Sequence, residues 1–244
     1  MILELKNLSI GYRFPLHKGV DLSLESGQLM ALMGKNGSGK STLIKTIAGI
    51  IPALSGDILV DKEKLSPQNL AKYISVVLTD QPIENLSVNE ILKMGRLPYT
   101  GITNQLKEAD LLLIERIAEQ LQLSPLRNRI YGNLSDGEKQ IVMIARAVIQ
   151  ETPIIILDEP LTHLDLENKA RVLKLLKELA ENGKLVVFST HDLNLIIPEI
   201  DQFIVINDKI NTPNNKDELK EIFNKLFSND LLKFDEKEMR FKII

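Results

Sequence analysis

The sequence predicts an α/β fold built on a mainly parallel β-sheet. Short apolar runs that are typical of buried strands alternate with segments of helical periodicity over residues 2–80 and 151–210. A glycine-rich loop joins one such strand to a helix at residues 34–42, and two carboxylates follow another strand at residues 158–159. Both features belong at the carboxyl ends of parallel strands, where ligands bind in open sheets.

Strands are predicted before the glycine-rich loop, and a helix followed by another strand is predicted after it. The alternating segment MILELKNLSIGY at the N-terminus predicts a strand rather than a signal peptide, because the acidic Glu4 lies within it. Residues 28–33 (QLMALM) predict a strand, and residues 42–50 predict a helix with apolar residues at helical spacing. Residues 74–78 (ISVVL) predict the next strand.

Residues 82–150 look mostly helical. We expect a short helix over residues 88–94, a long one over 105–123 and an apolar one over 138–150. The face of the long helix that is expected to be buried carries Ala109, Leu113, Ile117 and Leu121.

Residues 151–210 return to alternating strands and helices. The run 153–157 (PIIIL) predicts a strand buried on both faces, and residues 185–189 (LVVFS) predict another. Between them a helix is expected over residues 166–182, ending at Gly183. Its apolar positions are Ala170, Leu173, Leu176 and Leu179.

The tail, residues 211–244, predicts a helix and a hairpin. Asn215 with Glu218 resembles a capping box at the start of the helix. The helix has an apolar stripe that we expect to pack on its own domain. This stripe contains Leu219, Ile222, Phe223, Leu226 and Phe227. The segments 233–234 and 240–244, on either side of an acidic turn, predict the hairpin.

The glycine-rich loop has the pattern G-x-x-x-x-G-K-S, which is the phosphate-binding loop of nucleotide hydrolases. Glycines let backbone N–H groups approach phosphate oxygens, and the N-terminus of the following helix favours an anion. We expect Lys40 to reach the β- and γ-phosphates and Ser41 to offer its hydroxyl to Mg²⁺. The residues expected to bind nucleotide here are Gly34, Asn36, Gly37, Ser38, Gly39, Lys40, Ser41 and Thr42.

Asp158 and Glu159 follow the buried strand at residues 153–157. Two carboxylates at this position are costly unless they face a cleft. We therefore expect Asp158 to bind Mg²⁺, directly or through water, and Glu159 to hold the attacking water. A solvated acidic turn would explain the pair if it stood alone, but the phosphate-binding loop favours the functional interpretation.

Further segments resemble motifs of the ABC ATPases. Residues 134–140 (LSDGEKQ) resemble the LSGGQ signature, residues 162–165 the D-loop, and residues 189–192 the segment with the switch histidine. The resemblance covers about residues 2–210. It implies a P-loop ATPase with a mainly parallel core, an N-terminal antiparallel β part and an inserted helical subdomain. The implied division is a single domain, 1–244, with a RecA-like core (1–81 and 151–210), a helical subdomain (82–150) and a C-terminal extension (211–244).

The same resemblance implies roles for single residues toward ATP. Tyr12 would stack on adenine, and His191 would touch the γ-phosphate. Ser135 and the amides near Gly137 would contact the γ-phosphate of ATP on a partner subunit, so one chain would hold half of each site. Ser135 also fits an ordinary capping box with Glu138, and both interpretations can hold together.

The chain departs from the family pattern at three positions. Asp136 stands where the signature has glycine, and we expect its carboxylate to point away from phosphate. Glu138 replaces the usual glutamine of the signature. The position of the Q-loop glutamine is Thr79. Either Gln81 supplies the catalytic and Mg²⁺-binding side chain through a shifted loop, or Thr79 or Asp80 substitutes for it.

Composition limits the remaining possibilities. The net charge is −3 over 244 residues, so the composition gives no indication of a basic surface that would bind nucleic acid. There is no cysteine, which excludes disulfides and cysteine-ligated metals. No run of about 18 apolar residues is present, so we expect no membrane span and a cytoplasmic setting. The two histidines outside the switch segment, His17 and His163, are expected to be exposed.

Two segments suggest the class of ABC ATPase. VNEI with MGRLPY (residues 88–99) and THDLNL (190–195) look like the ATPases of bacterial importers for iron–siderophore, haem and cobalamin. This resemblance implies a homodimer on the cytoplasmic side of the membrane, bound to two permease subunits and serving a substrate-binding protein indirectly. The groove expected to receive the permease contains Ile83, Leu86, Val88, Met94 and Tyr99.

Two other functions remain open at this point. A soluble ABC-type assembly factor, such as those serving iron–sulfur cluster formation, would use the same ATPase without a permease. A regulatory module that clamps on ATP without turnover is disfavoured, because Lys40, Glu159 and His191 occur together.

Overall fold

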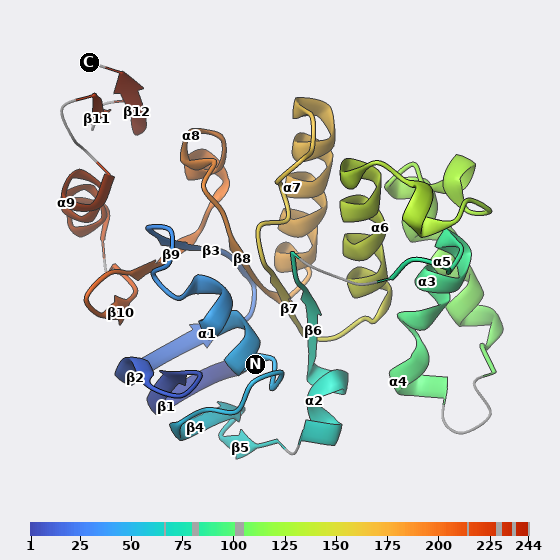
Figure 1. The fold of residues 1–244 in the computed structure, drawn as a ribbon, viewed down its shortest axis with the longest axis horizontal. Helices are drawn as coiled ribbons and strands as arrows, with labels where there is room; N and C mark the ends of the chain where they lie inside the picture. Colours follow the sequence, from blue (N-terminus) through green and yellow to red (C-terminus); the bar gives the residue numbers. More distant parts are fainter. Residues whose placement is uncertain are drawn as a thin grey trace.

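The computed structural model describes residues 1–244 except residues 66, 80–82, 101–104, 214, 228–230, 236–237 and 244. A six-stranded sheet of order β10-β9-β3-β8-β7-β6 runs through the middle of the molecule (Figure 1). All of its strand pairs are parallel except β9 with β10. The strands are β3 (Gln28–Gly34), β6 (Ile74–Val77), β7 (Ile154–Leu157), β8 (Leu185–Ser189), β9 (Gln202–Ile206) and β10 (Ile210–Asn211). The predicted mainly parallel sheet is confirmed.

Helices cover both faces of this sheet, because successive residues of a strand point to opposite faces. Met30 and Leu32 of β3 belong to the hydrophobic cluster on one face, and Leu29, Ala31 and Met33 belong to the cluster on the other. The covering helices are α1 (Lys40–Ile47) on the first face, and α6 (Asp136–Ile149) and α7 (Leu166–Glu181) on the second. The continuous apolar run of β3 therefore reflects burial on both sides.

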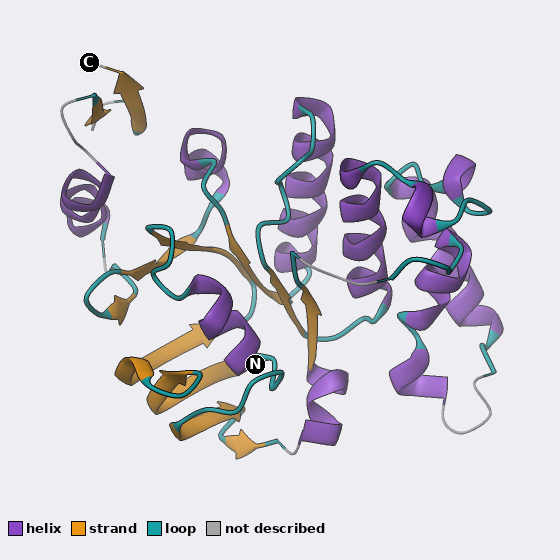
Figure 2. Ribbon diagram, in the orientation of Figure 1, coloured by secondary structure: helices purple, strands orange, loops and turns teal. Residues whose placement is uncertain are grey.

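The N-terminal part forms a separate antiparallel sheet of order β2-β1-β4-β5. Its strands are β1 (Ile2–Gly11), β2 (Pro15–Glu25), β4 (Ser55–Val60) and β5 (Glu63–Lys64). The inward side chains of β1, such as Leu3 and Leu5, join the cluster that contains α1. The antiparallel part is thus packed beside the helix that follows the glycine-rich loop, as Figure 2 shows at the lower left.

The middle of the chain is helical, as expected. The region 82–150 contains α3 (Val88–Met94), α4 (Leu97–Thr100), α5 (Glu108–Gln120) and α6, and α5 is shorter than the helix predicted over 105–123. The helix α2 (Pro67–Tyr73) precedes this region and was not predicted. The predicted buried face of α5 is wrong at its start, where Ala109 is exposed and Asp110 is buried. The carboxylate of Asp110 accepts hydrogen bonds from Arg96 Nε at 2.7 Å and from the backbone N–H of Lys107 at 2.9 Å. These partners make burial of the charge possible.

The predicted face of α7 is also partly wrong. Ala170 is exposed and Leu179 is only half-buried, whereas Val172 and Leu175 are buried. The predicted positions are three residues apart, and each step of three falls about 60° short of a full helical turn. Four such positions drift across the helix, so they cannot share one face. The helix ends before Gly183, which has a φ of +86°.

The C-terminal extension packs on its own domain, as predicted. It contains α9 (Lys216–Phe227) and a hairpin of β11 (Leu232–Asp235) and β12 (Arg240–Ile243). Asn215 Oδ1 accepts the backbone N–H groups of Asp217 and Glu218, at 3.0 and 2.9 Å. Leu219 and Phe223 of the stripe are buried. Within the described residues, no helix is long and apolar enough to cross a membrane.

Candidate active site

The glycine-rich loop connects β3 to α1, as predicted, although α1 starts at Lys40 and ends at Ile47 rather than running over 42–50. Gly37 and Gly39 have φ angles of +76° and +104°, which residues other than glycine rarely adopt. A Cβ on Gly34 would lie 2.5 Å from Ser38 Oγ and 2.7 Å from the carbonyl of Ile206. The tight turn therefore requires glycine at these positions. The predicted nucleotide-binding residues of this loop all lie in it or in the first turn of α1.

Lys40 is buried at the start of α1, with 6% of its surface exposed. Its Nζ donates to the carbonyl oxygens of Gly34 at 3.0 Å and Lys35 at 3.4 Å. Burial lowers the pKa of the Lys40 ammonium, and the negative charges of Glu159 and Asp158 oppose that shift. The structure thus brings the loop lysine within electrostatic reach of both predicted acids.

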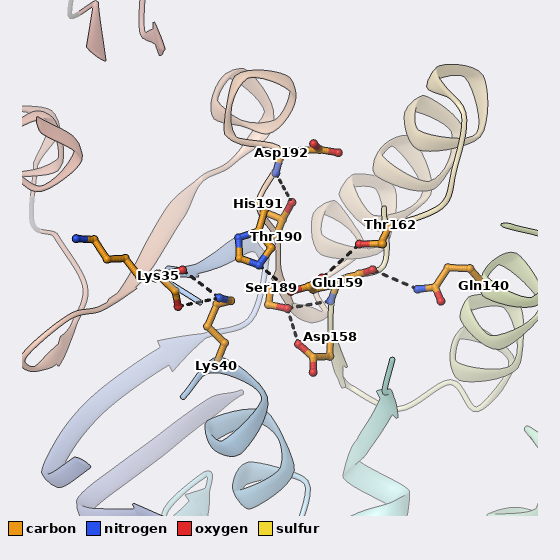
Figure 3. A network of polar contacts seen from close by, with 11 residues as sticks. Lys35, Lys40, Gln140, Asp158, Glu159, Thr162, Ser189, Thr190, His191 and Asp192 are labelled. Atoms are coloured by element: carbon orange, nitrogen blue, oxygen red, sulfur yellow. Dashed lines mark hydrogen bonds and ion pairs between the residues drawn. The ribbon is translucent and has the colours of Figure 1, made fainter. Parts of the chain in front are cut away.

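Asp158 and Glu159 follow β7 and are organised by a serine at the end of the neighbouring strand β8. Ser189 Oγ donates to Asp158 Oδ1 at 2.6 Å and accepts the backbone N–H of Glu159 at 2.8 Å (Figure 3). Ser189 and Asp158 are buried, with 0% and 2% exposure. One hydroxyl therefore fixes the orientation of the first acid and the backbone of the second.

The Glu159 carboxylate faces the switch-histidine segment. His191 Nε2 lies 2.8 Å from Glu159 Oε1, and Thr162 Oγ1 donates to Oε2 at 3.4 Å (Figure 3). Glu159 has a φ of +51°, a left-handed conformation. Such a conformation costs about 1–3 kcal/mol in a residue other than glycine, and it tends to persist at functional sites. Two of the predicted catalytic side chains, His191 and Glu159, are therefore in direct contact.

Sequence reasoning missed the role of Ser189. The signal was present, because a serine ends the otherwise apolar run LVVFS, and a buried hydroxyl needs partners. Its partners come from the adjacent parallel strand, 30 and 31 residues away in the sequence. Knowledge of strand order is needed to predict them.

The expectation that His17 is merely exposed is wrong. His17 lies in β2 and is half-buried, and its Nε2 is 2.8 Å from the carbonyl oxygen of Ser38 in the glycine-rich loop. Since a carbonyl only accepts, His17 Nε2 carries the proton in this contact. A side chain of the antiparallel sheet therefore supports the phosphate-binding loop. His163 is exposed, as expected.

Replacing His17 by alanine is expected to raise the KM for ATP about 3- to 10-fold, because the loop loses a hydrogen bond that holds its backbone. The kcat should change less than about twofold, since His17 contacts none of the acids. Steady-state ATPase kinetics measure both values. Lys18→Ala is the matched control, because Lys18 is exposed on the same strand. A KM equal to that of the wild type would show that the contact does not order the loop.

The signature segment forms the start of α6, which begins at Asp136 rather than at the predicted residue 138. Ser135 Oγ accepts the N–H of Glu138 at 3.3 Å, and Glu138 Oε2 accepts the N–H of Ser135 at 2.8 Å. This confirms the capping box, and the Ser135 N–H lowers the pKa of the Glu138 carboxyl. A Cβ on Gly137 would lie 2.9 Å from the carbonyl of His163, so the signature packs on the D-loop. The Asp136 side chain is 73% exposed.

Two of the three residues that could supply the Q-loop side chain, Asp80 and Gln81, lie outside the described part of the chain. Thr79 is described, and it lines a cavity of about 1030 Å³ together with Glu159, Thr162 and Gln140. Thr79 therefore faces the same space as the predicted catalytic acid. The choice between Gln81 and Thr79 stays a prediction.

Oxygen ligands for Mg²⁺ are present beside the loop. Ser41 is exposed in the first turn of α1, and Asp158 is an ionisable acid at the end of β7. Magnesium ions are usually held by one or two carboxylates together with substrate phosphates and water. In the described residues, no group of three or more His, Cys, Asp or Glu could hold a metal ion. The donor set fits a Mg²⁺ ion that binds together with a nucleotide.

Tyr12 follows the end of β1 and is 66% exposed. Its neighbour Phe14 is 83% exposed. Most of the Tyr12 surface is therefore accessible to a ligand. Stacking of Tyr12 on adenine stays a prediction.

Comparisons with known proteins indicate the family of this chain. The family described as ABC transporter matches residues 17–162. The hemin import ATP-binding protein of Shewanella denitrificans is 36% identical over 82% of this chain and 81% of its own length. The achromobactin transport ATP-binding protein of Dickeya dadantii is 32% identical over 84% and 78%. The manganese transport system ATP-binding protein of Listeria innocua is 31% identical over 85% and 88%.

Solved structures show the same fold. An ATP-binding subunit of an ABC transporter superposes with a TM-score of 0.80 at 27% identity, covering 93% of this chain and 95% of that one. A dimeric ATP-binding cassette bound to ADP and phosphate superposes with a TM-score of 0.76 at 25% identity, over 87% and 99%. The family match, the relatives and the arrangement of Lys40, Asp158, Glu159 and His191 lead to one conclusion: this chain belongs to the ABC transporter family, as one of its ATP-binding ATPases.

Proposed function

We propose that this chain is the ATP-hydrolysing, energy-coupling subunit of an importer for iron–siderophore, haem or cobalamin. The contact of 2.8 Å between His191 and Glu159, beside Lys40 and Asp158, carries the hydrolytic part of the proposal. The names of the hemin and achromobactin relatives support a metal-chelate cargo, and the manganese relative points to a metal ion instead. The segment VNEI with MGRLPY, at residues 88–99, favours the chelate class.

Each residue of the site has a defined task in this proposal. Backbone N–H groups of residues 34–42 and the Lys40 ammonium hold the β- and γ-phosphates of ATP. Glu159 orients a water for attack on the γ-phosphorus and accepts its proton. His191, hydrogen-bonded to Glu159, orients that carboxylate and reaches the γ-phosphate. Tyr12 stacks on adenine.

Mg²⁺ would be held by Ser41 and Asp158, with Gln81 as a further ligand. When bound, it neutralises charge on the β- and γ-phosphate oxygens. Ser189 orients the Asp158 carboxylate for this task, because its hydroxyl donates to Oδ1 at 2.6 Å.

The proposed assembly is a homodimer of this chain below two permease subunits, on the cytoplasmic face of the membrane. Ser135 and Gly137 of each chain complete the ATP site of the partner, and a substrate-binding protein delivers cargo to the permease. The dimeric cassette among the similar structures supports this arrangement. The division into core (1–81 and 151–210), helical subdomain (82–150) and extension (211–244) is part of the same proposal.

The surface proposed to receive the permease needs one correction. Val88 is completely buried in the core and is unavailable to a partner, because α3 turns it inward. Ile83 and Leu86 are half-buried against the same core. Leu97 and Tyr99, both in α4, are 46% and 41% exposed. The revised docking surface therefore centres on α4.

Leu97→Glu is expected to reduce recruitment to permease-containing membranes at least about tenfold, because a charge replaces apolar contact area in an interface. The basal ATPase rate should stay within about twofold of the wild type. Membrane flotation and ATPase assays on the same preparations measure both. Leu112→Glu makes the same chemical change at an exposed leucine of α5 and is the control.

Equal recruitment of both variants and the wild type would place the docking surface elsewhere. The transport names of the relatives do not favour the alternative, a soluble assembly factor. Purification of the wild-type chain with a soluble scaffold, and never with a membrane permease, would establish it instead.

A further inference from the structure

An asparagine of the switch-histidine segment is bonded to the C-terminal hairpin. Asn194 Nδ2 donates to the carbonyl oxygen of Phe241 at 3.1 Å, and the N–H of Phe241 donates to Asn194 Oδ1 at 2.7 Å. Asn194 lies in α8 (Leu193–Ile196), and Phe241 lies in β12, 47 residues later. One side-chain amide therefore occupies both backbone hydrogen-bonding groups of a single strand residue.

The geometry of the hairpin explains why these groups are available. Phe241 stands opposite Phe234 in the antiparallel pair of β12 and β11. In such a ladder, alternate residues direct their N–H and C=O groups away from the neighbouring strand. Phe241 is one of these residues, so its outward groups would otherwise remain at a strand edge. Asn194 takes the place that a further strand would take.

The hairpin is itself anchored to the central sheet. The Phe241 ring lies 4.9 Å from the Phe234 ring and 5.7 Å from the Phe223 ring of α9. Phe223 in turn packs on Phe203 of β9, edge to face, with centroids 5.6 Å apart. Such ring pairs add about 0.5–1.5 kcal/mol each to ordinary burial. Phe241 therefore presents a fixed backbone to Asn194.

Asn194 is three residues beyond His191 in a short, tightly bonded segment. The N–H of Leu193 donates to the carbonyl of His191 at 3.0 Å, and Asp192 pairs with Lys169 of α7 at 2.5 Å. A cavity of about 550 Å³ lies between this segment and the extension, lined by Thr190, His191, Phe227 and Phe241 among others. Side chains do not fill this space, and the Asn194 amide reaches from α8 to the hairpin.

We propose that Asn194 is a positioning residue for ATP hydrolysis: by pairing with the backbone of Phe241 it holds α8, so that the His191 imidazole stays against the Glu159 carboxylate. The C-terminal extension then serves as a rigid support for the switch histidine. This inference rests on the proposed hydrolytic role of His191 and adds a residue that acts through it.

Asn194→Ala is expected to lower kcat about tenfold and to change the KM for ATP less than about twofold, because His191 is held less firmly while the phosphate-binding loop is untouched. Asn194→Gln keeps both the donor and the acceptor and should retain most of the activity. Lys242→Ala is the control. It removes ion pairs within the extension, to Asp235 at 2.7 Å and Glu238 at 2.8 Å.

The second readout is the NMR signal of the His191 ring in the full-length chain. The sequence contains three histidines, so single His→Gln variants assign their Cε1–H signals. In Asn194→Ala the His191 signal should shift or broaden, while the His17 and His163 signals stay in place. The Gln and Lys242→Ala variants should resemble the wild type.

These two readouts separate failure of this inference from failure of the proposed function. An unchanged His191 signal together with an unchanged kcat in Asn194→Ala would overturn the inference. An equal loss of kcat in Lys242→Ala would also overturn it, because the extension would then act without Asn194. A wild-type chain that does not hydrolyse ATP contradicts the proposed function, and the NMR comparison still tests the position of His191.

Discussion

Lys40→Ala is expected to weaken ATP binding at least about 100-fold, because the site loses the buried cation that faces the β- and γ-phosphates. Lys40 is 6% exposed, and its ammonium is bonded to two carbonyl oxygens of the phosphate-binding loop, which places the cation at that loop. Burial lowers its pKa, while Glu159 and Asp158 oppose this shift. Bound phosphates would act in the same direction as the two acids and keep Lys40 charged.

Calorimetric titration with ATP and Mg²⁺ measures the affinity of this variant. Lys45→Ala removes a lysine from the last turn of the same helix and should bind ATP within about twofold of the wild type. Alanine at position 40 leaves two carboxylates without their facing cation, so thermal unfolding must accompany the titration. A folded Lys40→Ala chain that binds ATP like the wild type would exclude this loop as the phosphate site.

The strands, the phosphate-binding loop and the position of the acids were predictable because their signals are local. The run PIIIL followed by Asp158 and Glu159 is a buried strand with acids at its end, and the structure has that arrangement. The caps at Ser135 and Asn215 depend on residues only three apart. Both hydrogen bonds of the Ser135 capping box are present, and Asn215 Oδ1 accepts the N–H of Glu218.

The missed features depend on contacts between distant parts of the chain. His17 meets Ser38 only because the antiparallel sheet packs beside α1, and Ser189 meets Asp158 only because β8 lies beside β7. The buried face of α5 includes Asp110 because Arg96, from another part of the chain, hydrogen-bonds to its carboxylate. In each case a polar side chain has a long-range partner, which hydrophobic periodicity does not encode.

Glu159→Gln is expected to keep ATP binding within about threefold of the wild type and to lower kcat about 100- to 10,000-fold. Glutamine preserves the size of the side chain and the acceptor that meets His191 Nε2 at 2.8 Å. It cannot accept a proton from the attacking water, so the loss should appear in kcat and hardly in KM. Thr162→Ala removes only the weak contact of 3.4 Å to Oε2 and should be mild.

The same variant tests the shared ATP sites. If Ser135 and Gly137 complete the site of a partner chain, ATP that is bound and not hydrolysed should hold two copies together. Gel filtration with light scattering should then show a dimer of Glu159→Gln with ATP and Mg²⁺, and a monomer without nucleotide. Glu181→Gln, an exposed acid at the end of α7, is the control and should turn over ATP normally without accumulating as a dimer.

Turnover by Glu159→Gln at the wild-type rate would show that another residue is the general base. A variant that stays monomeric at high concentration with ATP would leave each chain with a complete site of its own, and Ser135 would then be only the cap of α6.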